Sequence, residues 1–527
     1  MRSWGDVMSQ PHKKEKENEN EKKILQNSSK VTRREALSKM TTAAIGAAAV
    51  VVVGGVTYYL STSQAPPAPT ATTTTAAPPP VTSAATSAVT QTGLTAGPPV
   101  YFNIWAFHPE IVQANMKIFN QEYNENCDIL QVPGDYYASL LTKFMTGPGS
   151  RMDMMYLHSD YMTRYYKAGW IQPVNDEEHF DEIKKDYGNK NLLDVLTMPD
   201  GNQCGWQYFN GTVPIQYNGK VLQKAGLADD TGHIKSSPKT WDDFVQMCRD
   251  VVKSKVVKYA YLPKWIQCGT CGINEIFDEY CISEGELQFD KVTQEPTFEN
   301  DTVMHILENM RTLIAENLAD PGVLALNEQD HITTFCAGKH AFTEVHDYDL
   351  VAFNDPKQSP DAGSYHWLPA QPGSKGWYPY MGAIYCISSH EYMKRSNNEA
   401  KRLERLHQFY AWKDKNGEYV AGKQWIQSPP FLGQPYTQYY DDPATKAAWL
   451  AQTYDEGDYE IRKKAHLTAV TPPGYVGMVW YSNWHEDLQS TLPKMALGQM
   501  TPQDAMTHMV DYANSLRKEF GGPEIWK

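Results

Sequence analysis

The sequence predicts an α/β fold in which a parallel or mixed sheet is covered by helices. Short apolar segments alternate with amphipathic helical segments between residues 100 and 173, at the spacing expected of such a sheet. The near-continuous apolar run at residues 152–157 is typical of a buried parallel strand. With 527 residues, the chain is long enough for two or three domains and a large core.

The elements of this first region follow one another in a regular order. Strands are expected at residues 100–105, 128–132 and 152–157, and helices at residues 110–123, 136–145 and 161–167. In the first helix, Ile111, Met116 and Phe119 share the apolar side. Gly169 is expected to end the third helix.

The stretch from Gly205 to Phe244 is the most informative part of the chain. A short apolar strand at residues 213–217 ends at an Asn-Gly turn, and the helix that follows closes at Ala225-Gly226. Thr240 can cap a further helix, and Asp243, three residues later, completes a capping box. The stretch is therefore expected to form strand, turn, helix and a second, capped helix.

This order resembles the crossover region of extracellular solute-binding proteins of the maltose-binding type, which deliver solutes to ABC importers. Four other segments resemble the family in the same order along the chain: residues 146–173, 334–342, 381–388 with the helix at 399–412, and 488–516. Phe342 stands where the family usually has Met. The resemblance covers nearly all of residues 100–527.

The resemblance implies a two-lobed, periplasmic-binding-protein-like (type II) α/β fold whose chain crosses between the lobes three times. Lobe one would comprise residues 100–210 and 375–428, and lobe two residues 215–370 and 432–527. The crossovers would lie near residues 210–212, 372–377 and 428–435, which are rich in Gly and Pro. The ligand would bind between the lobes.

The N-terminal region differs from the rest in composition. Residues 1–40 form a polar, charged tail, and residues 41–60 form an apolar run long enough to span a bilayer. Arg33-Arg34 resembles a twin-arginine export signal, but Ala36 stands where that pattern usually has a bulky apolar residue, so general secretion is the alternative export route. A cleaved signal is the alternative to the retained transmembrane anchor that we favour. Residues 61–99 are a Thr/Ala/Pro-rich stalk suited to O-glycosylation. A glycoprotein tethered in this way to the extracellular face of the membrane resembles archaeal solute-binding proteins.

Composition and motifs also exclude several functions. The formal net charge of −14 argues against nucleic acid as a partner. The chain lacks a Gly-x-Ser-x-Gly elbow, a P-loop and a His-Glu-x-x-His motif, so we expect no enzyme and no cofactor. A glycan-active enzyme would need a carboxylate pair, but no motif singles out a pair among candidates such as Asp160, Glu344 and Asp347.

A carbohydrate is the expected solute, and aromatic side chains at strand ends are the candidates for stacking on it. The 14 Trp and 32 Tyr provide rings for the apolar sugar faces, while Asp, Asn and His take up the hydroxyl groups. The expected ligand-binding residues are Trp105, His108, His158, Asp160, Trp206, Tyr208, Tyr348, Trp377, Tyr378, Trp480 and Tyr481. For each aromatic residue the alternative is a place in the core.

Two of these positions are supported by the resemblance in particular. Trp480-Tyr481 is most similar to the family's sugar-stacking pair, and Asp160 matches a hydroxyl-binding Asp of maltose-binding proteins. The residues that accompany this Asp differ, since Leu157 and Tyr161 replace the Trp and Arg of the family. The difference argues against a maltose-type pocket.

The sequence also offers alternatives to a sugar ligand and candidate sites of modification. Adjacent tyrosines at 136–137, 165–166 and 439–440 resemble ferric-ion ligands, and a peptide or polyamine is a further alternative. Among the eight cysteines, a disulfide from Cys268 or Cys271 to Cys281 is expected. Asn210 and Asn300 begin N-glycosylation motifs.

Overall fold

The structure is a computed structural model that describes residues 97–527, apart from residues 133–135, 267, 269–270, 374, 376–378, 381–382, 453–454 and 470–474. The predicted tail at 1–40, the predicted anchor at 41–60 and nearly all of the predicted stalk at 61–99 lie outside the described residues. No helix within the described part of the chain is long and apolar enough to cross a membrane.

The first sheet has five strands in the order β2-β1-β3-β11-β4. They are β1 (Tyr101–Ile104), β2 (Asp128–Gln131), β3 (Met154–His158), β4 (Trp206–Gln207) and β11 (Ala383–Ile387). β1 pairs in parallel with β2 and β3, whereas β11 is antiparallel to both β3 and β4. The predicted mixed sheet is therefore confirmed, and all five residues of β3 are buried as its apolar run indicated.

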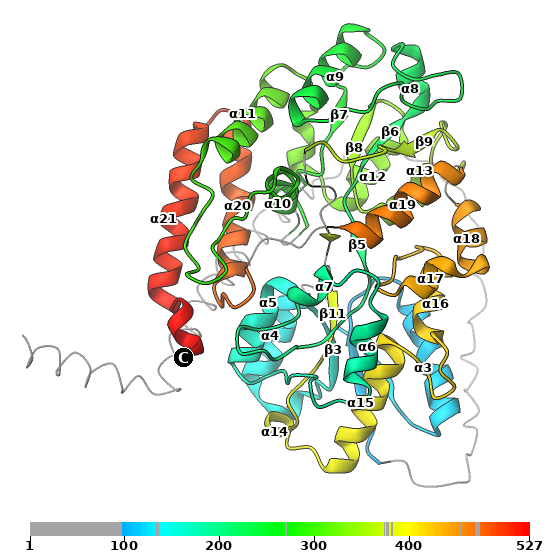
Figure 1. The fold of residues 1–527 in the computed structure, drawn as a ribbon, viewed down its shortest axis with the longest axis vertical. Coiled ribbons are helices and arrows are strands. Elements are labelled where there is room, and N and C mark those ends of the chain that lie inside the picture. Colours follow the sequence, from blue (N-terminus) through cyan, green and yellow to red (C-terminus); the bar gives the residue numbers. More distant parts are fainter. Residues whose placement is uncertain are drawn as a thin grey trace, which may run out of the picture. The chain divides into compact units, whose positions relative to one another are not determined.

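The second sheet has four strands in the order β7-β8-β6-β9. They are β6 (Ile215–Asn218), β7 (Tyr261–Leu262), β8 (Phe342–Glu344) and β9 (Tyr365–Trp367). β6 is antiparallel to both of its neighbours, and β7 is parallel to β8. Figure 1 shows the two sheets in separate parts of the molecule.

Helices pack around each sheet (Figure 1). Those near the first sheet are α3 (Pro109–Tyr123), α4 (Tyr136–Thr146), α5 (Ser159–Lys167), α6 (Phe180–Asp186), α7 (Asn191–Asp194), α14 (His390–Met393), α15 (Asn397–Ala411), α16 (Val420–Gln427), α17 (Thr437–Asp441) and α18 (Pro443–Leu450). The others are α8 (Gly219–Lys224), α9 (Trp241–Lys253), α10 (Ile273–Glu284), α11 (Asp301–Ala315), α12 (Glu328–Cys336), α13 (Leu350–Phe353), α19 (Glu456–Thr468), α20 (Tyr481–Ala496) and α21 (Pro502–Phe520). Short 3₁₀ helices occur at Pro148–Ser150, Pro321–Ala325, Asp347–Asp349 and Pro523–Trp526.

Two separate hydrophobic cores define two lobes. The core of the first lobe draws its buried residues from 100–209 and 384–459, and the core of the second lobe from 213–368 and 465–516. Residues between Phe431 and Tyr459 thus pack in the first lobe, although we expected the chain from residue 432 onward to belong to the second. The chain passes from one core to the other within α19.

The first two connections between the lobes run side by side. β5 (Gly211–Thr212) pairs antiparallel with β10 (Pro379–Tyr380), and this two-stranded ribbon joins neither of the two larger sheets. Figure 1 shows β5 and α19 next to each other between the lobes. The two-stranded ribbon and α19 therefore contain the connections between the lobes.

The local signals in the stretch from Gly205 to Phe244 are confirmed. α8 ends before Ala225, and Gly226 has a φ of 81°, a left-handed conformation that favours glycine. At the start of α9, the Thr240 side chain accepts a hydrogen bond from the Asp243 backbone N–H, and the Asp243 carboxylate accepts one from the backbone of Thr240. This capping box satisfies backbone donors that the helix cannot satisfy itself.

The predicted disulfide to Cys281 is wrong. Cys268 and Cys271 bond to each other, with their Cα atoms 5.2 Å apart. Cys281 is a free thiol, fully buried in α10 within the core of the second lobe. The folded chain also buries the Asn210 side chain, which donates to the backbone oxygen of His466, so this motif is not accessible for glycosylation after folding.

Candidate ligand-binding site

The first lobe presents an aromatic cluster at the carboxyl ends of its strands. Trp105 follows β1 and Tyr208 follows β4, and their ring centroids are 6.1 Å apart. Tyr156 packs against both, at 4.9 Å from Trp105 and 4.4 Å from Tyr208. The indole Nε1 of Trp105 is buried and has no hydrogen-bond partner among the described residues. A buried N–H without an acceptor is costly, so this group is a candidate donor to a ligand.

Tyr348 of the second lobe packs against aromatic residues of the first lobe beside this cluster. Its ring centroid is 5.9 Å from that of Phe107 and 6.3 Å from that of Phe209, both in the first lobe. The Tyr348 hydroxyl lies 2.7 Å from Nδ1 of His346, which follows β8. Tyr348 therefore connects the aromatic cluster of the first lobe to the strand ends of the second.

Buried charges line these strand ends in the second lobe. Lys264 follows β7, and its Nζ lies 2.7 Å from Oε2 of Glu275 and 2.7 Å from Nε2 of His346. Burial alone would raise the pKa of Glu275, but the charge of Lys264 and the contact with His346 keep this pKa below its ordinary value. The Lys264–Glu275 pair is thus a buried ion pair at the inner end of the second sheet.

Three neighbouring carboxylates each keep one oxygen without a hydrogen bond from any described residue. They are Glu275 and Glu279 on α10 and Glu344 at the end of β8, and all three side chains are buried. Burial raises the pKa of Glu344 to about 8, and burial with the charges of Glu344 and Glu275 raises the pKa of Glu279 well above its ordinary value. These acids, which we call the acidic floor, thus present buried polar atoms that still lack a hydrogen-bond partner among the described residues.

An ion pair joins the two lobes beside this floor. Asp160 in the first turn of α5 lies 2.9 Å from Nδ1 of His485 on α20, and Nε2 of His485 lies 3.3 Å from Asp278 on α10. Burial opposes charge on both partners of the Asp160–His485 contact. The neighbouring opposite charges outweigh it, so the pKa of His485 is raised well above its ordinary value and that of Asp160 is lowered. A charged imidazolium is therefore held between carboxylates of both lobes.

Further hydrogen bonds extend this contact along α5 and α20. The Tyr161 hydroxyl donates to Glu486 at 2.7 Å, and Arg164 donates to Asn483 at 3.2 Å. Each of these contacts joins a residue of the first lobe to one of the second. The two lobes therefore touch directly along this edge.

Asp347 has a different role from the one that an enzyme would require. Its carboxylate accepts from Nε of Arg462 at 2.9 Å and from the backbone N–H of Thr212 in the connecting ribbon at 3.2 Å. Burial raises the pKa of Asp347, but the charge of Arg462 lowers it to about 2. This carboxylate holds the crossover region together and has no oxygen left for acid–base chemistry.

The structure brings together six of the residues expected at the site. Trp105, His158, Asp160, Tyr208, Tyr348 and Tyr481 lie at strand ends or at the contact between the lobes. His158 caps α5 by accepting from the Asp160 backbone N–H, and the Tyr481 hydroxyl donates to Asp278 at 3.0 Å. Trp377 and Tyr378 lie outside the described residues.

Of the other three, two lie in the cores of the lobes, and His108 lies beside Phe107 in the loop after β1. Trp206 is fully buried in the core of the first lobe, where its Nε1 donates to Glu177 at 3.1 Å, so it is not at the rim. Trp480 is fully buried in the core of the second lobe, with its ring centroid 5.4 Å from that of Phe289. His108 is partly exposed and lies 2.8 Å from Glu110 at the start of α3. Because Trp480 is buried in this core, it packs there and is not exposed for stacking on a sugar.

The sequence reasoning missed Lys264, Glu275, Glu279 and His485. A signal was present in α10, where Glu275, Asp278 and Glu279 recur at the spacing of one helix face. Acids at this spacing usually face water. In this helix the face is buried, as is nearly every residue of α10.

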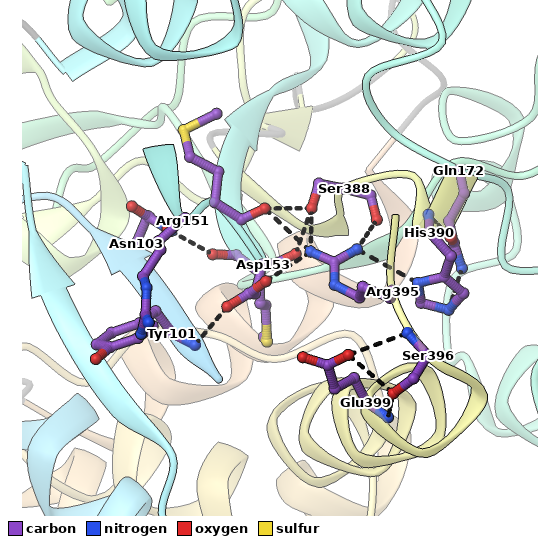
Figure 2. Close-up of polar contacts among 12 residues, drawn as sticks. Tyr101, Asn103, Arg151, Asp153, Gln172, Ser388, His390, Arg395, Ser396 and Glu399 are labelled. Carbon is purple, nitrogen blue, oxygen red and sulfur yellow. Dashed lines mark hydrogen bonds and ion pairs between the residues drawn. The ribbon is translucent and has the colours of Figure 1, made fainter. Parts of the chain in front are cut away.

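A second polar network lies at the opposite end of the first sheet (Figure 2). Arg395 donates to the Asp153 carboxylate at 2.7 Å and to the backbone oxygen of Ser388 at 2.8 Å, while Asp153 also accepts from the Tyr101 backbone N–H at 2.9 Å. It borders a surface pocket of about 150 Å³ near Pro98 and Pro99, where the described chain begins. Since Arg395 and Asp153 are paired within the lobe, this network links the ends of strands in the first sheet.

Comparison with known proteins agrees with this architecture. A profile of the bacterial extracellular solute-binding protein family matches residues 106–403. A search of curated protein sequences found no match.

Solved structures share the fold at low sequence identity. Maltose-bound MalE3 of T. maritima is 17% identical with a TM-score of 0.64, and the match covers 79% of this chain and 99% of that one. A solute-binding protein of Agrobacterium vitis with bound D-mannitol is 16% identical with a TM-score of 0.60, covering 81% and 99%. The cyclic α-maltosyl-1,6-maltose binding protein of Arthrobacter globiformis is 14% identical with a TM-score of 0.63, covering 80% and 99%.

At such identities the likeness establishes the two-lobed fold. The family profile, by contrast, extends over more than half of the chain, from the end of β1 into α15. The chain belongs to the bacterial extracellular solute-binding protein family.

Proposed function

We propose that this protein is the extracellular solute-binding component of an ABC importer and that it captures a carbohydrate between its two lobes. The observation that carries the proposal is that Tyr348 of the second lobe packs against Phe107 of the first and is linked through His346 to Glu275 of the acidic floor. Rings stack on the apolar faces of a sugar, and buried acceptors take the hydrogen bonds of its hydroxyl groups. Similar proteins were solved with maltose, D-mannitol and α-D-tagatose bound, which supports this class of solute.

Binding and release would follow from the two-lobed arrangement. A solute that contacts Trp105 on one lobe and Glu344 on the other stabilises the state in which the lobes are closed. The Asp160–His485 contact adds to that state from the edge of the lobes. The closed form is then the one that docks on the permease, and the protein carries out no chemistry on its solute.

A polyamine or another cationic solute is the second candidate, and the acidic floor favours it. Three buried carboxylates lie close together, and Lys264 is the one lysine that contacts them among the described residues. An ammonium group would compensate the unpaired oxygens by charge as well as by hydrogen bonds.

We also infer that residues 41–60 tether the protein to the membrane, with the stalk at 61–99 outside the cell, in the manner of archaeal solute-binding proteins. The apolar run with basic residues on its N-terminal side supports this topology. Intact-mass measurement of the mature protein distinguishes a retained anchor from a cleaved signal.

A thermal-shift screen at pH 6 and pH 8 separates the two solute classes. The panel contains mono- and oligosaccharides, polyols and polyamines, because a ligand that binds only the folded state raises the melting temperature. A neutral sugar is expected to give a shift that depends little on pH. A cation needs the ionised form of Glu344, whose pKa is about 8, so its affinity must rise toward pH 8 with release of protons. Stabilisation by polyamines alone would replace the sugar assignment.

Substitution of Trp105 tests the site itself. Trp105→Ala is expected to weaken binding of the identified solute at least about tenfold in titration calorimetry, as loss of an aromatic anchor does. Trp412→Ala is the matched control, because Trp412 is also a partly buried tryptophan of the first lobe but donates to Asp186 away from the strand ends. Equal losses in both variants would contradict the site.

A further inference from the structure

Two histidines of the second lobe meet an aspartate at the start of α19, away from the proposed solute site. His233 lies in the loop between α8 and α9, His366 lies in β9, and Asp455 is the N-cap of α19. One nitrogen or oxygen from each residue lies within 4.8 Å of the others. Nε2 of His233 is 2.8 Å from Oδ2 of Asp455, and the two imidazole centroids are 4.3 Å apart.

A hydrogen bond to Asp458 fixes the orientation of the His366 ring. Its Nδ1 lies 2.9 Å from Oδ2 of Asp458, whose other oxygen accepts from the backbone N–H of Trp367. A Cβ built on Gly232 would lie 3.5 Å from Nε2 of His366, so this second nitrogen faces the loop that carries His233. A carboxylate that holds one imidazole nitrogen and directs the other outward is the usual support of a metal-binding histidine.

Hydrogen bonds to the backbone of the loop position His233, so its imidazole ring is not needed for this. Oδ1 of Asp229 accepts from the backbone N–H of His233 at 3.0 Å and from that of Thr231 at 2.9 Å. Gly232 has a φ of 95° between them, a conformation that a side chain would strain. The fold therefore sets the imidazole opposite Asp455 in advance.

Access and ligand type both suit a transition-metal ion. His366 is fully buried, whereas the side chains of His233 and Asp455 are 40% and 32% exposed, so the group opens to solvent on one side. Ligands of a tetrahedral ion lie about 3.4 Å apart when the metal–ligand distance is about 2.1 Å, so shifts of less than about 1 Å bring the three atoms into place. Two imidazoles and one carboxylate favour Zn²⁺, Ni²⁺ or Cu²⁺ over Ca²⁺ or Mg²⁺.

We propose that His233, His366 and Asp455 bind one divalent transition-metal ion, with zinc as the best-matched element and water at the remaining position. The ion would replace the direct His233–Asp455 contact and connect the loop, β9 and the first turn of α19. Because α19 is the helix in which the chain passes between the lobes, the ion would fix one end of a crossover to the second lobe.

Another group of potential ligands does not support a metal ion. Glu328, His346 and Asp349 also lie close together. Nε2 of His346, however, is 2.7 Å from Nζ of Lys264, and its Nδ1 is 2.7 Å from the Tyr348 hydroxyl. A dication there would face a buried ammonium group and would find both imidazole nitrogens engaged.

Titration of the purified full-length protein with zinc chloride tests the proposal. Calorimetry should show saturable binding of one ion, and zinc should raise the melting temperature in a manner that EDTA reverses. Co²⁺ should give the visible absorption of a tetrahedral site at the same stoichiometry. His233→Ala should weaken this binding more than about tenfold, since loss of a group behind a ligand alone costs that much.

His508→Ala is the matched control. His508 lies 2.8 Å from Asp487 with 43% of its side chain exposed, much as His233 pairs with Asp455, but it belongs to no three-ligand group among the described residues. It should bind zinc as the unsubstituted protein does. The proposal is overturned if zinc does not bind saturably, if His233→Ala binds it unchanged, or if His508→Ala loses as much affinity. None of these readouts requires the solute, so the test stands apart from the proposed transport function.

Discussion

Two polar networks of this protein, one partly and one fully buried, differ in whether their hydrogen bonds are complete. Around Arg395, the guanidinium and the Asp153 carboxylate both find partners within the first lobe (Figure 2). In the acidic floor, Glu275, Glu279 and Glu344 each keep an oxygen that no described residue satisfies. Folding rarely leaves buried acceptors unpaired. The hydrogen bonds of the first network are all made within the protein and stabilise it, whereas the second network needs a ligand or a proton to pair its remaining oxygens.

Removal of Arg395 should have the largest effect on stability. Arg395→Met leaves the Asp153 carboxylate, whose side chain is only 14% exposed, without its charged partner, and such a loss costs about 3 kcal/mol of the free energy of unfolding. Equilibrium denaturation in guanidinium chloride measures it. The control is Arg405→Met, because Arg405 is half exposed beside Glu125 and should contribute less than about 1 kcal/mol. Equal losses would mean that the network around Arg395 is not a structural one.

Asp160→Asn should have an intermediate effect that depends on pH. It replaces a charged hydrogen bond to His485 by a neutral one, at a cost of about 1.5–3 kcal/mol near neutral pH. The raised pKa of His485 contributes stability that is complete below its ordinary pKa of 6.5 and is lost as pH rises through the raised value. The lowered pKa of Asp160 contributes stability above its ordinary pKa of 3.8 that is lost in stronger acid.

Denaturation from pH 5 to pH 10 measures this difference. The cost of the substitution should be largest at the acid end of that range and should shrink toward the alkaline end. A cost that is constant over the range would show that the contact between the lobes is not an ion pair.

Glu344→Gln should have the smallest effect at pH 5. The carboxyl group is protonated there in the folded protein, because its pKa is about 8, and the amide has the same shape, so we expect a change below about 1 kcal/mol. Between pH 5 and pH 8 the folded state holds a proton that the unfolded state releases, so wild-type stability falls as pH rises. The variant should lack the part of this slope that Glu344 contributes, up to about 1.4 kcal/mol per pH unit, while the raised pKa of Glu279 leaves its own part in place.

Glu177→Gln is the matched comparison for Glu344→Gln. Glu177 is an equally buried glutamate, but its two oxygens bind Trp206 and His407. The same substitution should cost about 1.5–3 kcal/mol there, as loss of a charged hydrogen bond does. If both substitutions had the same effect on the free energy of unfolding at pH 5, the number of hydrogen bonds made by each glutamate would not explain its contribution to stability.

Local signals in the sequence predicted much of the fold. The capping box at Thr240 and Asp243 and the buried strand at 154–158 depend on neighbouring residues, which the sequence shows directly. The position of the third crossing between the lobes does not depend on neighbouring residues alone. Tyr436 and Trp449 can be buried against either lobe, and only the tertiary fold places them in the first.

The site was less predictable for the same reason. Trp105 and Trp480 both flank an element, yet one lies among aromatic residues at strand ends and the other in a core. The acids of α10 have the spacing of a solvated face, and their burial follows only from the packing of α10 against α20. Cys281 likewise lies near Cys271 in sequence, but it is buried about two turns into α10, whereas Cys271 precedes that helix and bonds to Cys268.

The paired strands β5 and β10 limit how the lobes can move. Two hydrogen-bonded strands and the adjacent α19 attach one lobe to the other along a line, so bending about this line is the softest relative motion, and twisting or sliding would break the pairing. Such a connection leaves one principal degree of freedom between open and closed states. Little conformational entropy is then lost when a solute closes the lobes, so weak contacts with a small molecule suffice to shift the equilibrium.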